Sequence, residues 1–185
     1  MTNAPPDWLT LDNAAKIYPA VTTESLPTVF RMAATLDRPV NVAALQGALE
    51  RLMRRFPHYQ VDLKRGFFWY YLERHATPPA IQLLGDSPVA NVSIRNVGGH
   101  LFRVSARGNT VAVDYSHIIT DGYGGMQFLA TLLAEYYRRL GVAVPAEGYV
   151  LEPGDEPHPE EWEDAYKRYY REGAPSPPSL SRAYH

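Results

Sequence analysis

The stretch VAVDYSHIITDGYGGMQFL, from Val111 to Leu129, changes its pattern halfway along. The first half alternates between apolar and polar side chains, which predicts a β-strand, and the second half carries the apolar stripe of a helix. His117, Asp121 and Gly122 stand at the joint between the two elements. Because the strand fixes the backbone of its last residue and the loop opens beside it, we expect the ring of His117 to face a crevice.

The chain before this joint predicts a mixture of strands and helices. An amphipathic helix is capped by Asn41 and ended by Pro57, and the strands around it are rich in β-branched residues. The predicted elements are a short helix near Asp12–Ile17, a strand over Thr28–Leu36, a helix over Val42–Phe56, strands near Tyr59–Lys64 and Phe67–Arg74 joined by a turn at Arg65 and Gly66, and a weaker strand near Asn91–Arg95.

The residues around and after the joint predict a hairpin, a long helix and an irregular end. The hairpin runs from His100 to His117 with its turn at Gly108 and Asn109, and the helix after Gly125 stops at Gly141. Residues 143–159 have the composition of a linker, and a last helix near Glu160–Arg171 places four aromatic side chains on one face, namely Trp162, Tyr166, Tyr169 and Tyr170. Together these elements predict one α/β domain over 1–185, a two-layer sandwich with a mixed sheet and helices packed on one face.

Composition excludes several classes of function. The net charge is −2, so nucleic acid is not an expected partner. The absence of cysteine excludes disulfides, thiolate metal sites and a cysteine nucleophile. No apolar run reaches the roughly 20 residues that cross a bilayer, and the opening MTNAPPDW lacks the pattern of a signal peptide, so we expect a cytoplasmic protein.

The residue types at the joint are those of acid–base chemistry. An imidazole can accept a proton from a substrate near neutral pH, and the Asp121 carboxylate can cap the following helix or pair with a cation. Three alternatives remain open for His117. It is an ordinary buried histidine, a metal ligand with Asp121 that lacks a visible third ligand, or a member of a hydrolase triad with Ser116, whose side chain is expected to point away from the His117 ring.

The sequence SHIITDG, from Ser116 to Gly122, resembles the H-H-x-x-x-D-G motif of the chloramphenicol acetyltransferase-like superfamily. That superfamily includes condensation domains, carnitine and choline acyltransferases and alcohol acyltransferases. His117, Asp121 and Gly122 match, whereas Ser116 stands in place of the first histidine. Two further stretches resemble bacterial alcohol acetyltransferase-like proteins, namely LDNAAKIYP (Leu11–Pro19) and RRFPHYQVDLKRGFFWYYLE (Arg54–Glu73).

The resemblance implies one half of a CoA-dependent acyltransferase. Members of the superfamily consist of two similar halves that form a V around a substrate tunnel, and this chain has the size of the N-terminal half. The D-F-G-W-G signature of the second half has no counterpart here. We therefore expect residues 173–185 to cross toward a missing C-terminal half or a second chain, and we expect the chain alone to be inactive.

The resemblance also implies roles for individual residues. His117 is the general base, which takes a proton from an alcohol or amine as it attacks an acyl thioester, carried by CoA or by a carrier protein. No tightly bound cofactor and no metal is implied. Asp121 and Gly122 shape the loop, and Arg31 is either a partner for the Asp121 carboxylate or an outward-facing residue of its strand. Gly122 and Gly125 let the tunnel wall approach the acyl donor. The remaining implied substrate-binding residues are Tyr115, Ser116 and Tyr123, with packing as the alternative for the two tyrosines.

A second function from another class is open at this point. In it, the chain is a non-catalytic binding or dimerisation module derived from the same fold, because half a tunnel encloses no site and lacks oxyanion donors.

Overall fold

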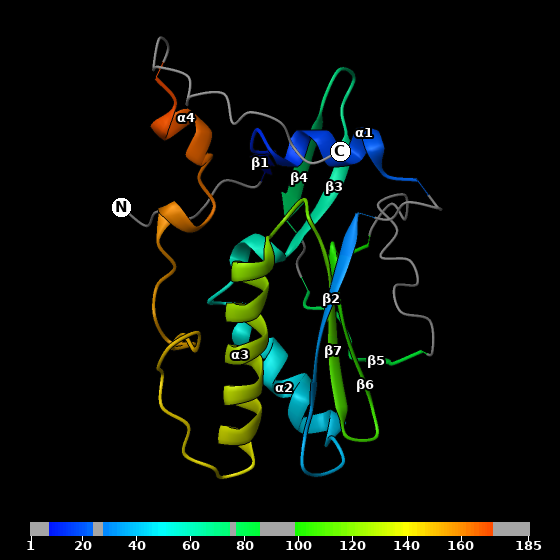
Figure 1. Cartoon of the computed structure of the whole chain (residues 1–185), viewed down its shortest axis with the longest axis vertical. Helices are drawn as coiled ribbons and strands as arrows, with labels where there is room; N and C mark the ends of the chain where they lie inside the picture. The colour runs from blue at the N-terminus through cyan, green and yellow to red at the C-terminus, as the bar shows by residue number, and fades with distance from the viewer. Residues whose placement is uncertain (1–7, 24–27, 75–76, 86–98, 172–185) are drawn as a thin grey trace, which may run out of the picture.

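Two β-sheets and two long helices make up the computed structural model, which describes residues 8–23, 28–74, 77–85 and 99–171 (Figure 1). The larger sheet carries the helices on one face, and the smaller sheet lies at one end of it. The α/β class with helices packed on one face is confirmed. The single sheet of the expected sandwich is in fact two sheets.

The larger sheet has four strands in the order β2 (Val29–Thr35), β7 (Thr110–Ser116), β6 (Phe102–Arg107) and β5 (Gln82–Leu83). The first three strands are antiparallel to their neighbours and β5 is parallel to β6, so the sheet is mixed as expected. Gly108 takes a φ of 56° in the β6–β7 turn, a conformation that glycine adopts without strain. β5 was not predicted, because two exposed residues carry no periodic pattern.

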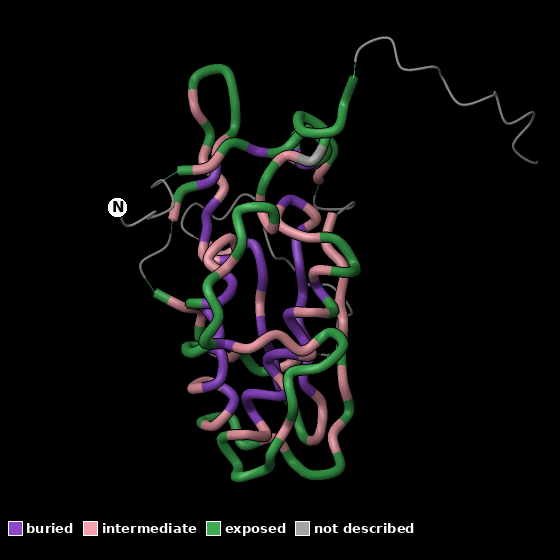
Figure 2. The backbone as a smooth tube through the Cα atoms, turned by 90° about the vertical axis from the view of Figure 1, so that its left-hand side faces the viewer, coloured by how far each residue is buried: buried purple, intermediate pink, exposed green. Residues whose placement is uncertain are grey.

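Alternation along β7 explains why one face of this sheet is buried under helices. Val111, Val113 and Tyr115 point to one side, and the register places Phe30 and Phe102 beside Tyr115 on that same side. These side chains form the main core with the apolar stripes of α2 (Val42–Leu52) and α3 (Gly122–Arg139). The buried stretches of the chain lie together between the helices and the sheet (Figure 2). Each fully buried side chain of this size stabilises the fold by about 1.5–3 kcal/mol.

Both long helices begin where a side chain caps their first turn. The Asn41 side chain accepts a hydrogen bond from the Ala44 amide at 3.1 Å. α2 ends at Leu52, earlier than the predicted Phe56, because the chain turns toward the short 3-10 helix η2 (Pro57–Tyr59). α3 begins at Gly122 rather than after Gly125, because its cap is Asp121.

The smaller sheet is antiparallel, in the order β1 (Trp8–Thr10), β4 (Tyr70–Arg74) and β3 (Val61–Arg65). β4 begins three residues later than predicted. The Gly66 amide bonds the Trp69 carbonyl at 2.7 Å, so the turn spans four residues. This turn leaves Phe67 91% exposed and Phe68 82% exposed at the tip of the hairpin.

A second apolar cluster joins the smaller sheet to the end of the larger one. The short helices η1 (Ala15–Ile17) and α1 (Tyr18–Val21) follow β1 and pass beside this junction. The buried members of the second cluster are Leu11, Ala15, Val61, Leu72, Leu101 and Ile118. Ile118 belongs to the loop after β7, so the residues next to His117 are part of the contact between the two sheets.

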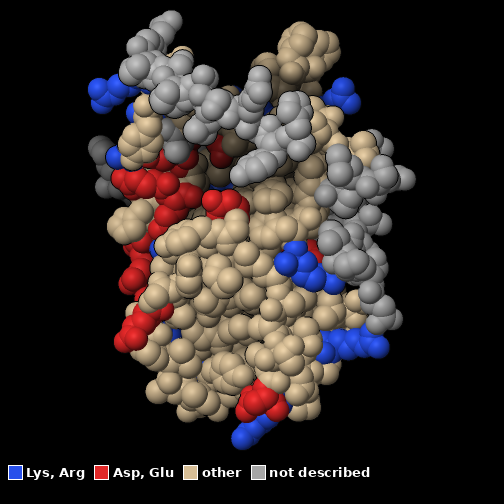
Figure 3. Space-filling model, viewed as in Figure 1, with Lys and Arg blue, Asp and Glu red and all other residues tan. Residues whose placement is uncertain are grey.

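The chain after α3 is irregular as far as a 3-10 turn, η3 (Pro159–Glu161), and a short helix, α4 (Ala165–Tyr169). The predicted helix over Glu160–Arg171 is therefore wrong in length, because the Asp164 side chain starts a new helix by accepting the Tyr166 amide. Acidic side chains line this part of the molecule (Figure 3), namely Glu152, Asp155, Glu156, Glu160, Glu161, Glu163 and Asp164. The predicted strand near Asn91–Arg95 and the segment 173–185 lie outside the described residues.

Candidate functional site

The backbone on both sides of His117 is fixed by hydrogen bonds. β7 ends at Ser116, and the His117 amide donates to the Thr28 carbonyl at 3.1 Å, which extends the pairing with β2 by one residue. The Ile119 amide then donates to the Ser116 carbonyl at 3.2 Å and turns the chain away from the sheet. The strand end and the tight turn together hold the Cα position of His117.

The His117 ring is half-buried and lies against two aromatic rings. Its centroid is 5.4 Å from that of Tyr18 with 18° between the planes, and 4.5 Å from that of Phe30 with 33° between the planes. Among the described residues no side chain forms a hydrogen bond with its ring nitrogens. Within the described part of the chain, the His117 side chain is therefore held by ring contacts and not by hydrogen bonds.

Asp121 closes the loop by capping α3. Its carboxylate accepts a hydrogen bond from the Gly124 amide at 2.9 Å, and its carbonyl accepts from the Gly125 amide at 2.9 Å. A negative charge at a helix N-terminus is stabilised by the helix dipole. Of the two roles that the sequence left open for this carboxylate, the structure shows the cap.

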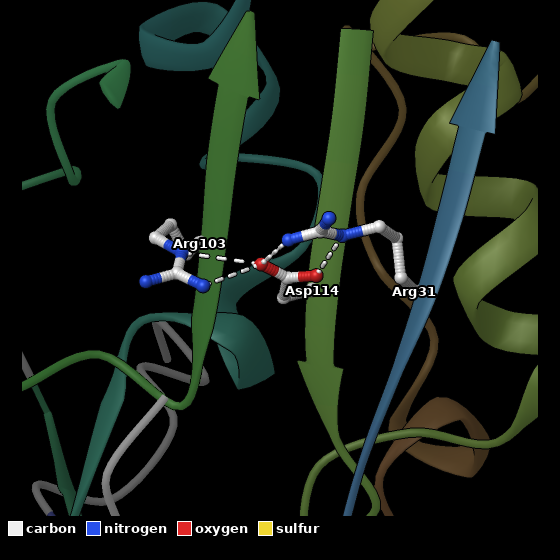
Figure 4. Close-up of polar contacts among 3 residues, drawn as sticks. All are labelled: Arg31, Arg103 and Asp114. Atoms are coloured by element: carbon white, nitrogen blue, oxygen red, sulfur yellow. Dashed lines mark hydrogen bonds and ion pairs between the residues drawn. The ribbon is translucent and has the colours of Figure 1, made fainter. Parts of the chain in front are cut away.

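The expected pair between Arg31 and Asp121 is wrong. Arg31 lies directly opposite Asp114 in the β2–β7 register, and its guanidinium donates to the two carboxylate oxygens at 2.6 and 3.0 Å. Arg103, opposite Asp114 on the other side, donates to Oδ2 at 2.7 and 3.1 Å (Figure 4). An antiparallel ladder brings these three residues together, whereas Asp121 lies beyond the end of the ladder.

The Arg31–Asp114–Arg103 cluster lies on the sheet face opposite the helices, and its carboxylate is buried. Asp114 has no exposed side-chain area, and each arginine side chain is 20% exposed. A buried carboxylate is stable only when cations and donors surround it, and two guanidinium groups supply both here. The sequence analysis missed Asp114 and Arg103, although an aspartate within an alternating apolar strand is itself a signal of a paired charge.

Three residues predicted to bind substrate lie in the core instead. Tyr115 and Ser116 have no exposed area, the Tyr115 hydroxyl donates to the Gly125 carbonyl at 2.9 Å, and the Ser116 hydroxyl accepts from the Ile118 amide at 3.3 Å. At Gly125, a Cβ atom would lie 3.2–3.3 Å from ring atoms of Phe30 and Tyr115. The close approach at Gly125 therefore packs α3 against the sheet.

The remaining predicted residues lie at the surface. Tyr123 is 62% exposed, and its ring is 5.5 Å from that of Tyr149. A Cβ atom at Gly122 would meet nothing within 4 Å, so this glycine faces open space at the start of α3. Tyr123 and Gly122 thus border the loop, and neither forms a described contact with the His117 ring.

The buried Tyr59 side chain supports the loop through the Thr120 hydroxyl. The Tyr59 hydroxyl donates to the Thr120 hydroxyl at 2.9 Å, and Thr120 in turn donates to the Asp121 carbonyl at 3.3 Å. Burial, opposed in part by this hydrogen bond, raises the pKa of Tyr59, so its hydroxyl remains a donor across the physiological pH range. This pair fixes the residue before the helix cap.

Two of the open alternatives for His117 find no support in this geometry. The buried Ser116 hydroxyl is engaged by the backbone and cannot reach a substrate. Within the described residues, no three metal-ligating side chains come together.

No helix in the described part of the chain is long and apolar enough to cross a membrane.

Comparison with known proteins finds similarity at the level of structure. No protein-family model and no curated protein sequence matches the chain. SgcC5 from Streptomyces globisporus is 17% identical with a TM-score of 0.58, covering 76% of this chain and 39% of its own. The starter condensation domain of rhizomide synthetase RzmA is 16% identical with a TM-score of 0.56, covering 77% and 40%. The X-domain from teicoplanin biosynthesis is 17% identical with a TM-score of 0.57, covering 83% and 36%.

These similarities define the class of the fold. The chain has the fold of part of a condensation-type domain, and it spans about two-fifths of the length of the structures that it resembles. That share is consistent with the N-terminal half that the sequence motif implies, and the predicted resemblance is confirmed at the level of the fold.

Proposed function

We propose that this chain forms the N-terminal half of an acyltransferase in which His117 is the general base. The observation that carries the proposal is the placement of the imidazole at the end of β7, with a fixed backbone and a ring that is half-buried. The fold adds support, because a mutant of the starter condensation domain of RzmA, which is similar in structure, is known in complex with C8-CoA. The substrates are an acyl thioester, of CoA or of a carrier protein, and a small alcohol or amine.

The chemical step is a direct transfer. A ring nitrogen of His117 takes the proton from the acceptor hydroxyl or amine as that atom attacks the thioester carbonyl. The carbon–sulfur bond then breaks, and the leaving thiolate takes the proton back from the imidazolium. A single tunnel that holds both substrates lowers the barrier through positioning. Donors for the oxyanion come from the part of the site opposite this chain.

An assay of thiol release tests this function. The full-length protein is incubated with acyl-CoA donors and a panel of alcohols and amines, and free CoA is followed with a thiol reagent. These 185 residues contain no cysteine, and a blank without substrates gives the background from the rest of the protein. We expect thiol release that depends on the acceptor, and an unchanged protein mass after incubation with the donor alone. A stoichiometric acyl adduct on the protein, or no release with any pair, would overturn the proposal.

A second candidate is a protein-binding or dimerisation module. The exposed aromatic tip of the β3–β4 hairpin favours it, since large apolar patches mark interaction surfaces, and the similar X-domain of teicoplanin biosynthesis is known in complex with OxyB. Light scattering on the chain together with the thiol assay separates the two functions. A stable, inactive dimer supports the module, whereas turnover supports the acyltransferase.

A further inference from the structure

Tyr18 contacts the ring of His117, although the two residues are far apart in the sequence. Tyr18 is the first residue of α1, in the segment that links the two sheets. Its ring and the imidazole are stacked, with centroids 5.4 Å apart and planes inclined by 18°. Offset stacking of this kind is a favoured geometry for planar rings.

A chain of hydrogen bonds ties Tyr18 to the backbone of His117. The Thr22 hydroxyl donates to the Tyr18 carbonyl at 2.7 Å and lies 2.5 Å from the Thr28 hydroxyl. Because a hydroxyl has a single hydrogen and that of Thr22 points to Tyr18, the Thr28 hydroxyl is the donor to Thr22. The Thr28 carbonyl accepts from the His117 amide at 3.1 Å, which completes the connection. These hydrogen bonds therefore fix the backbone of Tyr18 relative to the backbone of His117.

Phe30 supplies a second ring contact from β2, the strand that pairs with β7. Its centroid is 4.5 Å from that of His117. Gly125 lies against the Phe30 ring from α3, so Phe30 is itself fixed by packing. With both ring contacts in place, rotation of the imidazole about its side-chain bonds is restricted.

Restricted rotation matters because proton transfer is directional. The lone pair of an imidazole nitrogen lies in the ring plane, so an acceptor hydroxyl must approach the ring edge. The near-parallel planes of Tyr18 and His117 place the tyrosine against a face of the imidazole and not in the plane of its nitrogens. Misplacement of a catalytic group by about 1 Å can cost about 10²-fold in rate.

We propose that Tyr18 is a positioning residue that orients the His117 imidazole for in-plane proton transfer. This inference rests on the proposed function, since it assigns to Tyr18 a part in the same reaction. Tyr18 does not touch the reacting atoms. Its effect is therefore on the rate of the bound complex and not on substrate affinity.

Two substitutions and a matched control test this role. Tyr18→Leu removes the stacked ring, and Tyr18→Phe keeps the ring without its hydroxyl. Leu63→Ala weakens the same apolar cluster, against which both Leu63 and Tyr18 pack, without touching His117. We expect Tyr18→Leu to lower kcat roughly 10- to 100-fold with KM within about twofold. Tyr18→Phe should return kcat to within about threefold, and Leu63→Ala should lower Tm and leave kcat in place.

A wild-type kcat in folded Tyr18→Leu would overturn the proposal, and so would a loss of kcat in Tyr18→Phe equal to that in Tyr18→Leu. A second measurement does not depend on activity. The NMR signals of the His117 ring protons carry the ring-current shift of Tyr18, which should disappear in Tyr18→Leu and persist in Tyr18→Phe. If the shift does not change in Tyr18→Leu, the ring contact is absent and the inference fails. If the wild-type protein shows no turnover, the proposed function fails, while the ring-current shifts still decide whether Tyr18 orients the imidazole.

Discussion

Asp121 stabilises the loop after His117 through a backbone amide and not through a side-chain cation. This difference matters for how substitutions are interpreted, because a helix cap tolerates a neutral acceptor whereas an ion pair does not. At the residue scale, the candidate site therefore consists of a base whose backbone is held by β2 and a helix cap, Asp121, that follows four residues later.

Substitution of Asp121 separates these two roles. Asp121→Ala removes the acceptor for the Gly124 amide, and we expect the free energy of unfolding to fall by about 1 kcal/mol. Asp121→Asn keeps an acceptor and loses the charge at the helix N-terminus, at a cost of about 0.5 kcal/mol. Urea unfolding of the two variants measures both. If both variants lose roughly 2 kcal/mol or more of unfolding free energy, to the same extent, the Asp121 carboxylate acts in an ion pair and not as a cap.

At the scale of elements, the three antiparallel strands β2, β7 and β6 are joined on one face by the core and on the other by Asp114. The carboxylate accepts hydrogen bonds from Arg31 of β2 and Arg103 of β6, so it links both neighbours of β7. His117 follows directly after the last residue of this strand, Ser116. The hydrogen bonds to Asp114 therefore stabilise β7, the strand that positions the candidate base.

Removal of the Asp114 carboxylate is expected to lower the stability of the fold. Asp114→Ala leaves two guanidinium groups without their shared carboxylate, and we expect a loss of about 3 kcal/mol in the free energy of unfolding. Arg103→Ala is the matched control, since it keeps the Arg31–Asp114 pair, and should cost about half as much. Chemical denaturation compares the two. A loss below about 1 kcal/mol for Asp114→Ala would show that the cluster contributes no more than a surface pair.

At the scale of the whole molecule, a partly buried ion pair connects the chain after α3 to the main core. The Arg55 guanidinium donates to both carboxylate oxygens of Glu161 at 2.6 and 2.8 Å. The His58 ring lies beside this pair and 6.3 Å from the ring of Trp162. Its Nδ1 atom is buried and forms no hydrogen bond with the described part of the chain.

Acid is expected to weaken this attachment. Burial lowers the pKa of His58 to about 4, and the nearby Arg55 acts in the same direction while Glu161 opposes it. Between pH 6.5 and about 4 the unfolded chain binds a proton that the folded chain does not, so stability is complete above pH 6.5 and falls as the pH drops. The loss across this window reaches at most about 3 kcal/mol.

Unfolding free energies measured from pH 7 to pH 4.5 check this dependence. His58→Phe keeps an aromatic ring beside Trp162 and cannot titrate, so its stability should change less with pH over the same range. Parallel curves for the wild-type protein and His58→Phe would show that His58 is not responsible. Glu161, whose pKa is lowered by hydrogen bonds from Arg55 and the His158 backbone against the opposing effect of burial, adds its loss only at more acidic pH.

Local patterns predicted the elements that local interactions determine. The β6–β7 hairpin, β2 and the long helices follow from alternation, an apolar stripe and caps close in sequence. The partner of Arg31 did not follow, because it depends on a register between residues 83 positions apart. The second sheet likewise depends on contacts between distant segments, because β1 pairs with β4, and no periodicity in the sequence encodes that pairing.

For the candidate site, too, the sequence predicted the local features and not the contacts between distant segments. The position of His117 after a strand and the cap by Asp121 follow from the joint itself, and the structure has both. Tyr115 alternates toward the helices with Val113, which in retrospect indicates the core and not a ligand. The contact of Tyr18 with His117 joins segments 99 residues apart, 18 to 117, and only the folded chain reveals it.

The central claim is that the His117 imidazole accepts the proton of the acyl acceptor. The most direct measurement is the rate of acceptor-dependent thiol release by His117→Ala in the full-length protein, with unchanged Tm as evidence of folding. If His117 is the general base, the rate should be roughly 10²- to 10⁴-fold lower than that of the wild-type protein. A rate within about threefold of wild type would contradict it, because a general base contributes far more than that.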